Sequence, residues 1–89
     1  MAWQFEFDPV KSANNLAKHG IDFSSAQKLW DDADRVEIPA RSADEQRWVV
    51  IGRIDGCLWA AVVTRRRHAV RLISVRRTRR SEEELYEGP

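Results

Sequence analysis

Eight arginines gather in one short stretch of the second half of this chain. The segment from Thr64 to Arg80 contains these eight arginines and no carboxylate, and every basic residue after residue 45 is an arginine. Arginine carries a planar fork of donors that binds phosphate oxygens in pairs and stacks on bases. The stretch therefore favours nucleic acid as a partner. A solvated surface, or an acidic protein partner, is the alternative interpretation of the charge density.

His19 is the first candidate for proton transfer, because an unperturbed imidazole titrates near pH ~6.5 and so exists in both forms at neutral pH. It stands one residue before Gly20, which is predicted to end a helix. A histidine that only caps the last carbonyls of that helix is therefore the alternative. Neither His19 nor His68 has a ligand at metal-site spacing, so the sequence predicts no metal and no cofactor.

Arg71 and Arg76 are predicted to stabilise a transition state, because a strand holds a guanidinium more rigidly than a loop does. They are five residues apart in or just beyond a predicted strand. Regular alternation would point them to opposite faces, so that one would contact a helix or a protein partner. A bulge or strand end near Ser74 would remove this conflict, and the sequence leaves the choice open.

Two residues near the C-terminus have both a chemical and a structural interpretation. Glu82 is a candidate general base, and it is equally expected as a first-turn glutamate that complements a helix dipole. Tyr86 is a candidate for stacking on a base or for donating a proton, whereas packing is the ordinary role of an aromatic residue in a short helix.

These side chains must be positioned by one domain comprising residues 1–89, since the chain is too short to bury two cores. Hydrophobic residues make up 43% of the chain and charged residues 33%, which excludes a disordered or low-complexity protein. The sequence shows no membrane span or secretory signal and a single cysteine, so we expect a cytoplasmic protein. Its four tryptophans are expected in the core.

The hydrophobic pattern predicts an α+β fold of order β-α-α-β-β-β-β-α, an antiparallel sheet with two helices on one face and a short C-terminal helix. Asp8-Pro9 and Gly20 delimit the first helix, and Asp55-Gly56 predicts a hairpin. The other face of the sheet is expected to be available to a partner. The predicted strands are 3–7, 35–40, 46–54, 58–64 and 70–75, and the predicted helices are 9–19, 23 to about 31, and one capped by Ser81. The predicted inner face of the first helix is Val10, Ala13, Leu16 and Ala17.

Short motifs from Phe5 to Glu87 resemble the BrnT family of toxins from bacterial type II toxin-antitoxin systems. They are Phe7-Asp8-Pro9, Lys18-His19-Gly20-Ile21, Glu45 with Arg47, Ile51-Gly52, Arg71-Leu72-Ile73-Ser74-Val75-Arg76-Arg77, and Glu82 with Tyr86. The resemblance implies a RelE-like ribonuclease fold and a toxin that cleaves messenger RNA. It further implies a partner, a ribbon-helix-helix (BrnA-like) antitoxin, through which the complex binds operator DNA.

RNA carries its own nucleophile, so a base, an acid and fixed cations suffice for a metal-independent endoribonuclease that inhibits translation. The predicted catalytic residues are His19, Arg66, Arg71, Arg76 and Glu82. The predicted RNA-binding residues are Lys18, Arg65, Arg67, Arg77, Arg79, Arg80 and Tyr86. The alternative is a non-catalytic nucleic-acid-binding or antitoxin-binding module that acts in operon autoregulation. The arginine cluster, with no need for His19, motivates the nucleic-acid-binding module. Val63 and Glu83, where the family has tyrosine and arginine, motivate the antitoxin-binding one.

Overall fold

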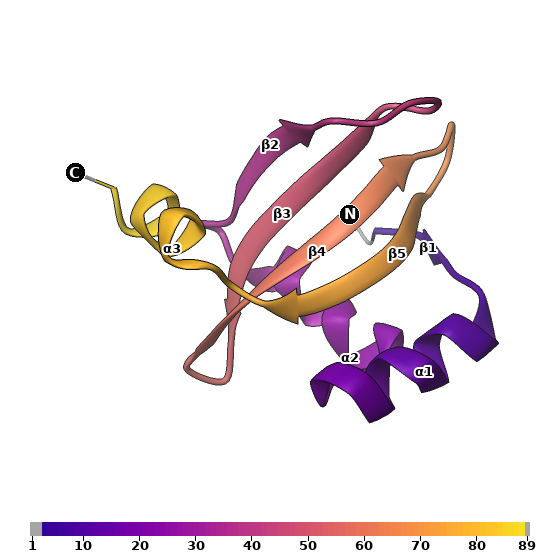
Figure 1. The fold of residues 1–89 in the computed structure, drawn as a ribbon, viewed down its shortest axis with the longest axis horizontal. Coiled ribbons are helices and arrows are strands. Elements are labelled where there is room, and N and C mark those ends of the chain that lie inside the picture. Colours follow the sequence, from indigo (N-terminus) through magenta and orange to yellow (C-terminus); the bar gives the residue numbers. More distant parts are fainter. Residues whose placement is uncertain (1–2, 89) are drawn as a thin grey trace.

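A computed structural model describes residues 3–88 and shows a mixed α+β domain, which confirms the predicted class (Figure 1). Its elements are β1 (Phe5–Glu6), α1 (Pro9–His19), α2 (Phe23–Ala26), the 3-10 helix η1 (Gln27–Asp31), β2 (Val36–Ala40), β3 (Arg47–Ile54), β4 (Cys57–Arg65), β5 (Val70–Arg77) and α3 (Arg80–Glu87). None of the helices described is long and apolar enough to cross a membrane.

The five strands form one sheet in the order β1-β5-β4-β3-β2. Strands β2 to β5 are an antiparallel meander, and Asp55 and Gly56 both adopt positive φ in the β3–β4 turn, as the hairpin signal predicts. The prediction of a wholly antiparallel sheet is wrong at β1, which pairs parallel with β5 through Phe5 and Glu6. Helix α1 begins directly after this short strand, so the chain leaves the sheet before β1 can lengthen.

Helix α1 has the predicted limits but not the predicted inner face. The Asp8 carboxylate accepts a hydrogen bond from the Val10 N–H, and Gly20 ends the helix with φ +83°. Val10 and Leu16 are exposed, whereas the buried residues are Ser12 and Asn15. The helix lies against β5, next to the edge strand β1, and its buried polar side chains hydrogen-bond to backbone groups. The predicted apolar face of Val10, Ala13, Leu16 and Ala17 therefore points to solvent.

The segment predicted as a single second helix is divided. Asp22 caps α2 as expected, but the α-helix ends at Ala26 and continues as η1. Leu29 of η1 packs against Gly52, where an added Cβ would lie 3.0 Å from the Leu29 Cδ2 atom. The absence of a side chain at Gly52 is what allows this close approach.

The main core lies between the sheet and the α2–η1 segment and includes Phe23, Leu29 and Trp30. The prediction that all four tryptophans belong to the core is wrong for Trp3, which is 52% exposed because it precedes β1 and lies outside the sheet. Trp48 and Trp59 are half-buried at the margin of the core.

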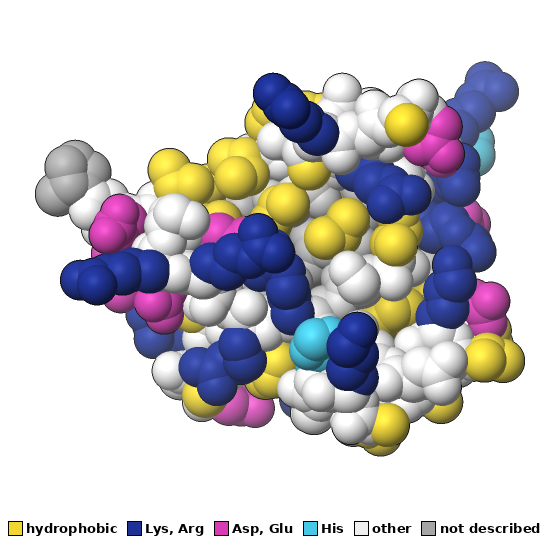
Figure 2. Space-filling view, viewed as in Figure 1, with side chains coloured by type: hydrophobic (Ala, Val, Ile, Leu, Met, Phe, Trp, Pro, Cys, Tyr) yellow, Lys and Arg dark blue, Asp and Glu magenta, His cyan; other side chains and the backbone are white. Residues whose placement is uncertain are grey.

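The other side of the sheet, here called the open face, carries a second and smaller apolar cluster. This cluster consists of Val36, Ile38, Ala40, Val49, Ile51, Ala60, Val62 and Tyr86. Figure 2 shows hydrophobic side chains along the middle of this face with lysine and arginine side chains on both sides. Tyr86 brings α3 to one end of the open face.

Helix α3 begins at Arg80, so the predicted cap at Ser81 is wrong. The Glu82 carboxylate instead accepts from the Arg79 N–H, 2.8 Å away.

Candidate functional site

A β-bulge determines which arginines share the open face. Val62 of β4 pairs with Ser74 and Val63 pairs with Leu72, which leaves Ile73 of β5 without a partner. This extra residue restores a common orientation to Arg71 and Arg76, which lie opposite Thr64 and Ala60. The structure thus has the bulge near Ser74 that places both arginines on one face of the sheet.

Arg76 and Glu82 form a bidentate ion pair. Its two terminal nitrogens lie 2.8 Å from the two carboxylate oxygens, and the side chains are 22% and 10% exposed. The hydrogen bonds from Arg76 lower the pKa of Glu82 against the opposing effect of burial, and Glu82 in turn raises the pKa of Arg76. A carboxylate that is ionised and bonded in this way positions the guanidinium.

His19 lies at the same end of β5. The Asn15 side chain, one helical turn earlier, donates to the Val75 carbonyl at 2.9 Å and accepts from the Val75 N–H at 3.1 Å. Residues four apart share one side of a helix, so half-buried His19 faces the end of β5 that carries Arg76. Figure 1 shows the C-terminal end of α1 beside the C-terminal end of β5.

Three predicted site residues thus lie toward the same end of β5, on α1, β5 and α3, and two of them, Arg76 and Glu82, are in direct contact. The three residues are His19, Arg76 and Glu82.

A comparison with protein families identifies the class of protein to which this chain belongs. Residues 7–82 match the family described as the ribonuclease toxin, BrnT, of type II toxin-antitoxin systems. The chain belongs to this family. The predicted resemblance is confirmed, and membership makes RNA the class of substrate and an antitoxin the class of partner. A comparison with curated proteins found no match.

In this BrnT-family chain, Arg66 and Arg71 lie at the other end of β5, away from Arg76. Arg66 forms ion pairs with Glu45 at 2.6 Å and with Glu6 at 3.5 Å, and Arg71 lies 3.5 Å from the same Glu6 carboxylate. All of these side chains are about 36–44% exposed, so the pairs are weak and open to exchange with another anion.

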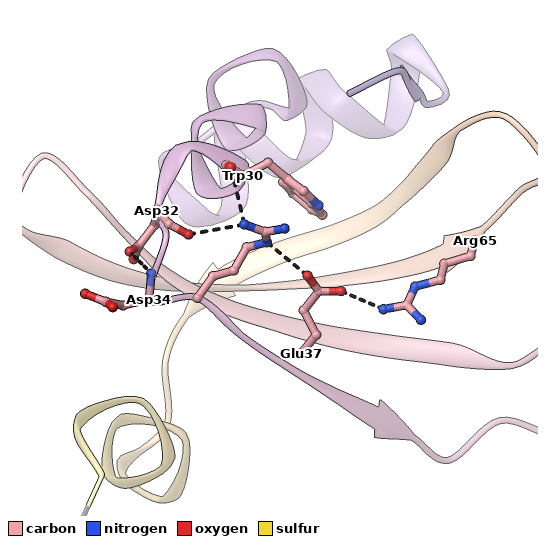
Figure 3. Close-up of polar contacts among 6 residues, drawn as sticks. Trp30, Asp32, Asp34, Glu37 and Arg65 are labelled. Atoms are coloured by element: carbon pink, nitrogen blue, oxygen red, sulfur yellow. Dashed lines mark hydrogen bonds and ion pairs between the residues drawn. The ribbon is translucent and has the colours of Figure 1, made fainter. Parts of the chain in front are cut away.

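Arg65 and Arg77 lie on the face opposite Arg71 and Arg76. Arg65 donates to Glu37 at 2.6 Å, and its guanidinium lies 3.9 Å from the centre of the Trp48 ring. Glu37 also accepts from Arg35, so one carboxylate joins two arginines across the helix-covered side of the sheet (Figure 3).

Arg77 is held in a similar way. Its guanidinium lies over Trp59, and its Nε donates to the Leu58 carbonyl at 3.1 Å. These two predicted RNA contacts are therefore separated from the arginines of the open face.

The remaining predicted RNA-binding residues lie at exposed positions or at the end of α3. Lys18, Arg67, Arg79 and Arg80 are exposed. The Tyr86 hydroxyl donates to Asp32 at 2.7 Å, which raises the pKa of the phenol. Burial alone would raise the pKa of Asp32, but this bond and those from the Arg53 and Asp34 backbone lower it. The hydrogen bond from Tyr86 thus connects α3 to the segment after η1.

Sequence reasoning gave no site role to two residues of the open face, Thr64 and Arg47, of which Arg47 was named only within a family motif. Both share one cross-strand row with Arg71. Alternation along β3, counted back from Val49 and Ile51, could have placed Arg47 on this face. Within residues 3–88 there is no group of three or more His, Cys, Asp or Glu side chains that could hold a metal ion.

Proposed function

We propose that this BrnT-family protein is a metal-independent endoribonuclease with a RelE-like fold, which cleaves messenger RNA and thereby inhibits translation. The observation that carries the proposal is the group of His19, Arg76 and Glu82 beside the open face. It combines an imidazole, whose ring nitrogens can accept or donate a proton, with a guanidinium fixed in one orientation. The family supplies the substrate class.

The reaction would use the 2′-hydroxyl of the substrate as nucleophile. A base removes its proton, the oxygen bonds to the adjacent phosphorus, and the bond from phosphorus to the 5′-oxygen breaks. An acid then protonates the 5′-oxygen, so the products are a 2′,3′-cyclic phosphate and a 5′-hydroxyl. We assign proton transfer to His19 and stabilisation of the charged phosphorus centre to Arg76.

Glu82 acts in this proposal by positioning Arg76. An arginine has five N–H donors, and the hydrogen bonds of Arg76 to Glu82 and to the Arg77 carbonyl use three of them. Two donors remain for phosphate oxygens. The other predicted RNA contacts, including Arg66, Arg71 and Lys18, extend the cationic surface away from this centre.

Neutralisation by a ribbon-helix-helix (BrnA-like) antitoxin, with operator DNA bound only through that partner, completes the proposed role. The activity would take place in the cytoplasm, where messenger RNA is translated. A non-catalytic nucleic-acid-binding module is the second candidate, and the observation that favours it is the engagement of Arg76 by Glu82.

Cleavage of RNA in EDTA tests the proposal. The purified chain, His19→Ala and Arg76→Ala are incubated with total RNA, beside Lys28→Ala, which removes an exposed charge from η1. We expect 2′,3′-cyclic phosphate ends from the parent and the Lys28 variant, and at least a tenfold lower rate from the other two. Intact RNA with salt-dependent binding would favour the non-catalytic module, and cleavage by His19→Ala at the parental rate would overturn the site assignment.

A further inference from the structure

We propose that Arg47, Thr64 and Arg71 form a second phosphate-binding site on the open face, which holds RNA at a distance from Arg76. The inference rests on the proposed function, because it takes RNA as the ligand. It adds two residues, Arg47 and Thr64, that the proposed function does not use.

The three side chains form one row across the sheet. Arg47 of β3 pairs with Thr64 of β4, and Thr64 pairs with Arg71 of β5. Directly opposed residues in adjacent strands point to the same face, so two guanidinium groups flank one hydroxyl. Two arginines and a hydroxyl group are donors that suit the oxygens of a phosphodiester.

Unpartnered polar atoms mark this row. Among the described residues, the buried side-chain nitrogen and oxygen atoms without a hydrogen-bond partner are Arg47 Nε and Thr64 Oγ1. Buried polar groups are nearly always hydrogen-bonded, so two such atoms in one row call for an acceptor. A phosphate supplies acceptor oxygens of the kind that both donors need.

The Glu6 carboxylate, which lies close to Arg71, leaves the site open to another anion. Glu6 lies 3.5 Å from Arg71, and the two side chains are 44% and 36% exposed. An exposed pair of this kind contributes little to stability, so a phosphate can replace the carboxylate. By contrast, the ion pair between Arg76 and Glu82 is short, bidentate and mostly buried.

The separation of the two sites sets the length of RNA that can bridge them. Thr64 and Ala60, the partners of Arg71 and Arg76, are four residues apart on β4, which corresponds to roughly 13 Å along an antiparallel strand. The apolar side chains of Val49 and Val62 lie between the two rows. Figure 2 shows this arrangement, with hydrophobic side chains between groups of lysine and arginine. A dinucleotide would reach one site, and a longer strand would reach both.

Binding of a non-cleavable RNA tests the inference. The probe is a fluorescent 2′-O-methyl oligonucleotide of about eight nucleotides, titrated by anisotropy at several salt concentrations. For Arg47→Gln we expect roughly tenfold weaker binding, and a salt slope smaller by about 0.7, because one phosphate contact is lost. The matched control is Lys28→Gln, which removes an exposed charge from the helix-covered side and is expected to bind like the parent.

The Thr64→Val variant distinguishes a loss of RNA binding at this site from a loss of folding. It removes a buried hydroxyl that has no partner, so thermal stability is expected to stay the same or rise while RNA affinity falls. Parental affinity and salt slope in both Arg47→Gln and Thr64→Val would overturn the second site and leave the proposed function intact. A parent chain that neither binds nor cleaves RNA would instead overturn the proposed function.

Discussion

Asn15 is expected to be a principal polar support of the fold, and its removal gives a quantitative test. The Asn15 side-chain amide makes three hydrogen bonds, to the Ile21 carbonyl at 2.8 Å, the Val75 carbonyl at 2.9 Å and the Val75 N–H at 3.1 Å. Each contributes about 1 kcal/mol net, and their loss leaves buried backbone groups without partners. Asn15→Ala should therefore lower the free energy of unfolding by about 3 kcal/mol before any gain in helix propensity.

The control is Asn14→Ala, because Asn14 is the exposed neighbour on the same helix. Both changes gain about 0.5 kcal/mol of helix propensity, so subtracting one from the other cancels that gain. Asn15→Ala itself should unfold at a Tm lower by roughly 10–20 °C, given about 4–8 °C per kcal/mol for a domain of this size. Urea denaturation and thermal melts followed by circular dichroism measure both quantities. A difference between the two variants below about 1 kcal/mol would refute the account of how α1 is attached to β5.

Three other substitutions test the site and its supports. Glu82→Gln should lower the free energy of unfolding by about 1–3 kcal/mol at neutral pH. Because Arg76 lowers the pKa of Glu82, this stabilisation is present above pH 4.5, the ordinary pKa of a glutamate, and is lost as the pH falls below it. Urea denaturation at a series of pH values measures the loss. Tyr86→Phe should cost about 1 kcal/mol by denaturation. The raised pKa of Tyr86 means that this contribution is present below pH 10.0 and is lost above it. Gly20→Ala should cost about 1 kcal/mol and lower the Tm by about 4–8 °C in a thermal melt, because φ there is +83°.

The elements predictable from sequence are those set by local chemistry. Asp8, Gly20 and the Asp55-Gly56 turn act within a few residues of themselves, so the limits of α1 and the β3–β4 hairpin follow from the sequence. The buried side of α1 could not be predicted in this way. Ser12 and Asn15 are buried because they hydrogen-bond to the backbone of Phe23, beyond the helix, and of Val75, far along the chain. Hydrophobic periodicity cannot show such partners.

The site was predictable as a set of residue types but not as an arrangement. Arginines on and around the last strand are evident from composition, whereas the faces they occupy depend on the bulge at Ile73. A bulge is a property of two paired strands, so the sequence of β5 alone cannot predict which faces of the sheet Arg71 and Arg76 occupy. Arg47 was given no role at the site because it lies on β3, outside the arginine-rich stretch, and only the strand register brings it beside Thr64.

The bulge also makes β5 respond differently to changes in chain length at different positions. Ile73 has no partner on β4, so deleting it would bring Leu72 and Ser74 into regular alternation and leave Val75 and Arg76 on their present faces. A single-residue insertion between Ser74 and Val75 would instead turn the residues beyond it over. Arg77 would then replace Arg76 on the open face, and Val75 would leave the main core. Such an insertion would change the charge pattern little and the packing greatly, so it should be tolerated far less than deletion of Ile73.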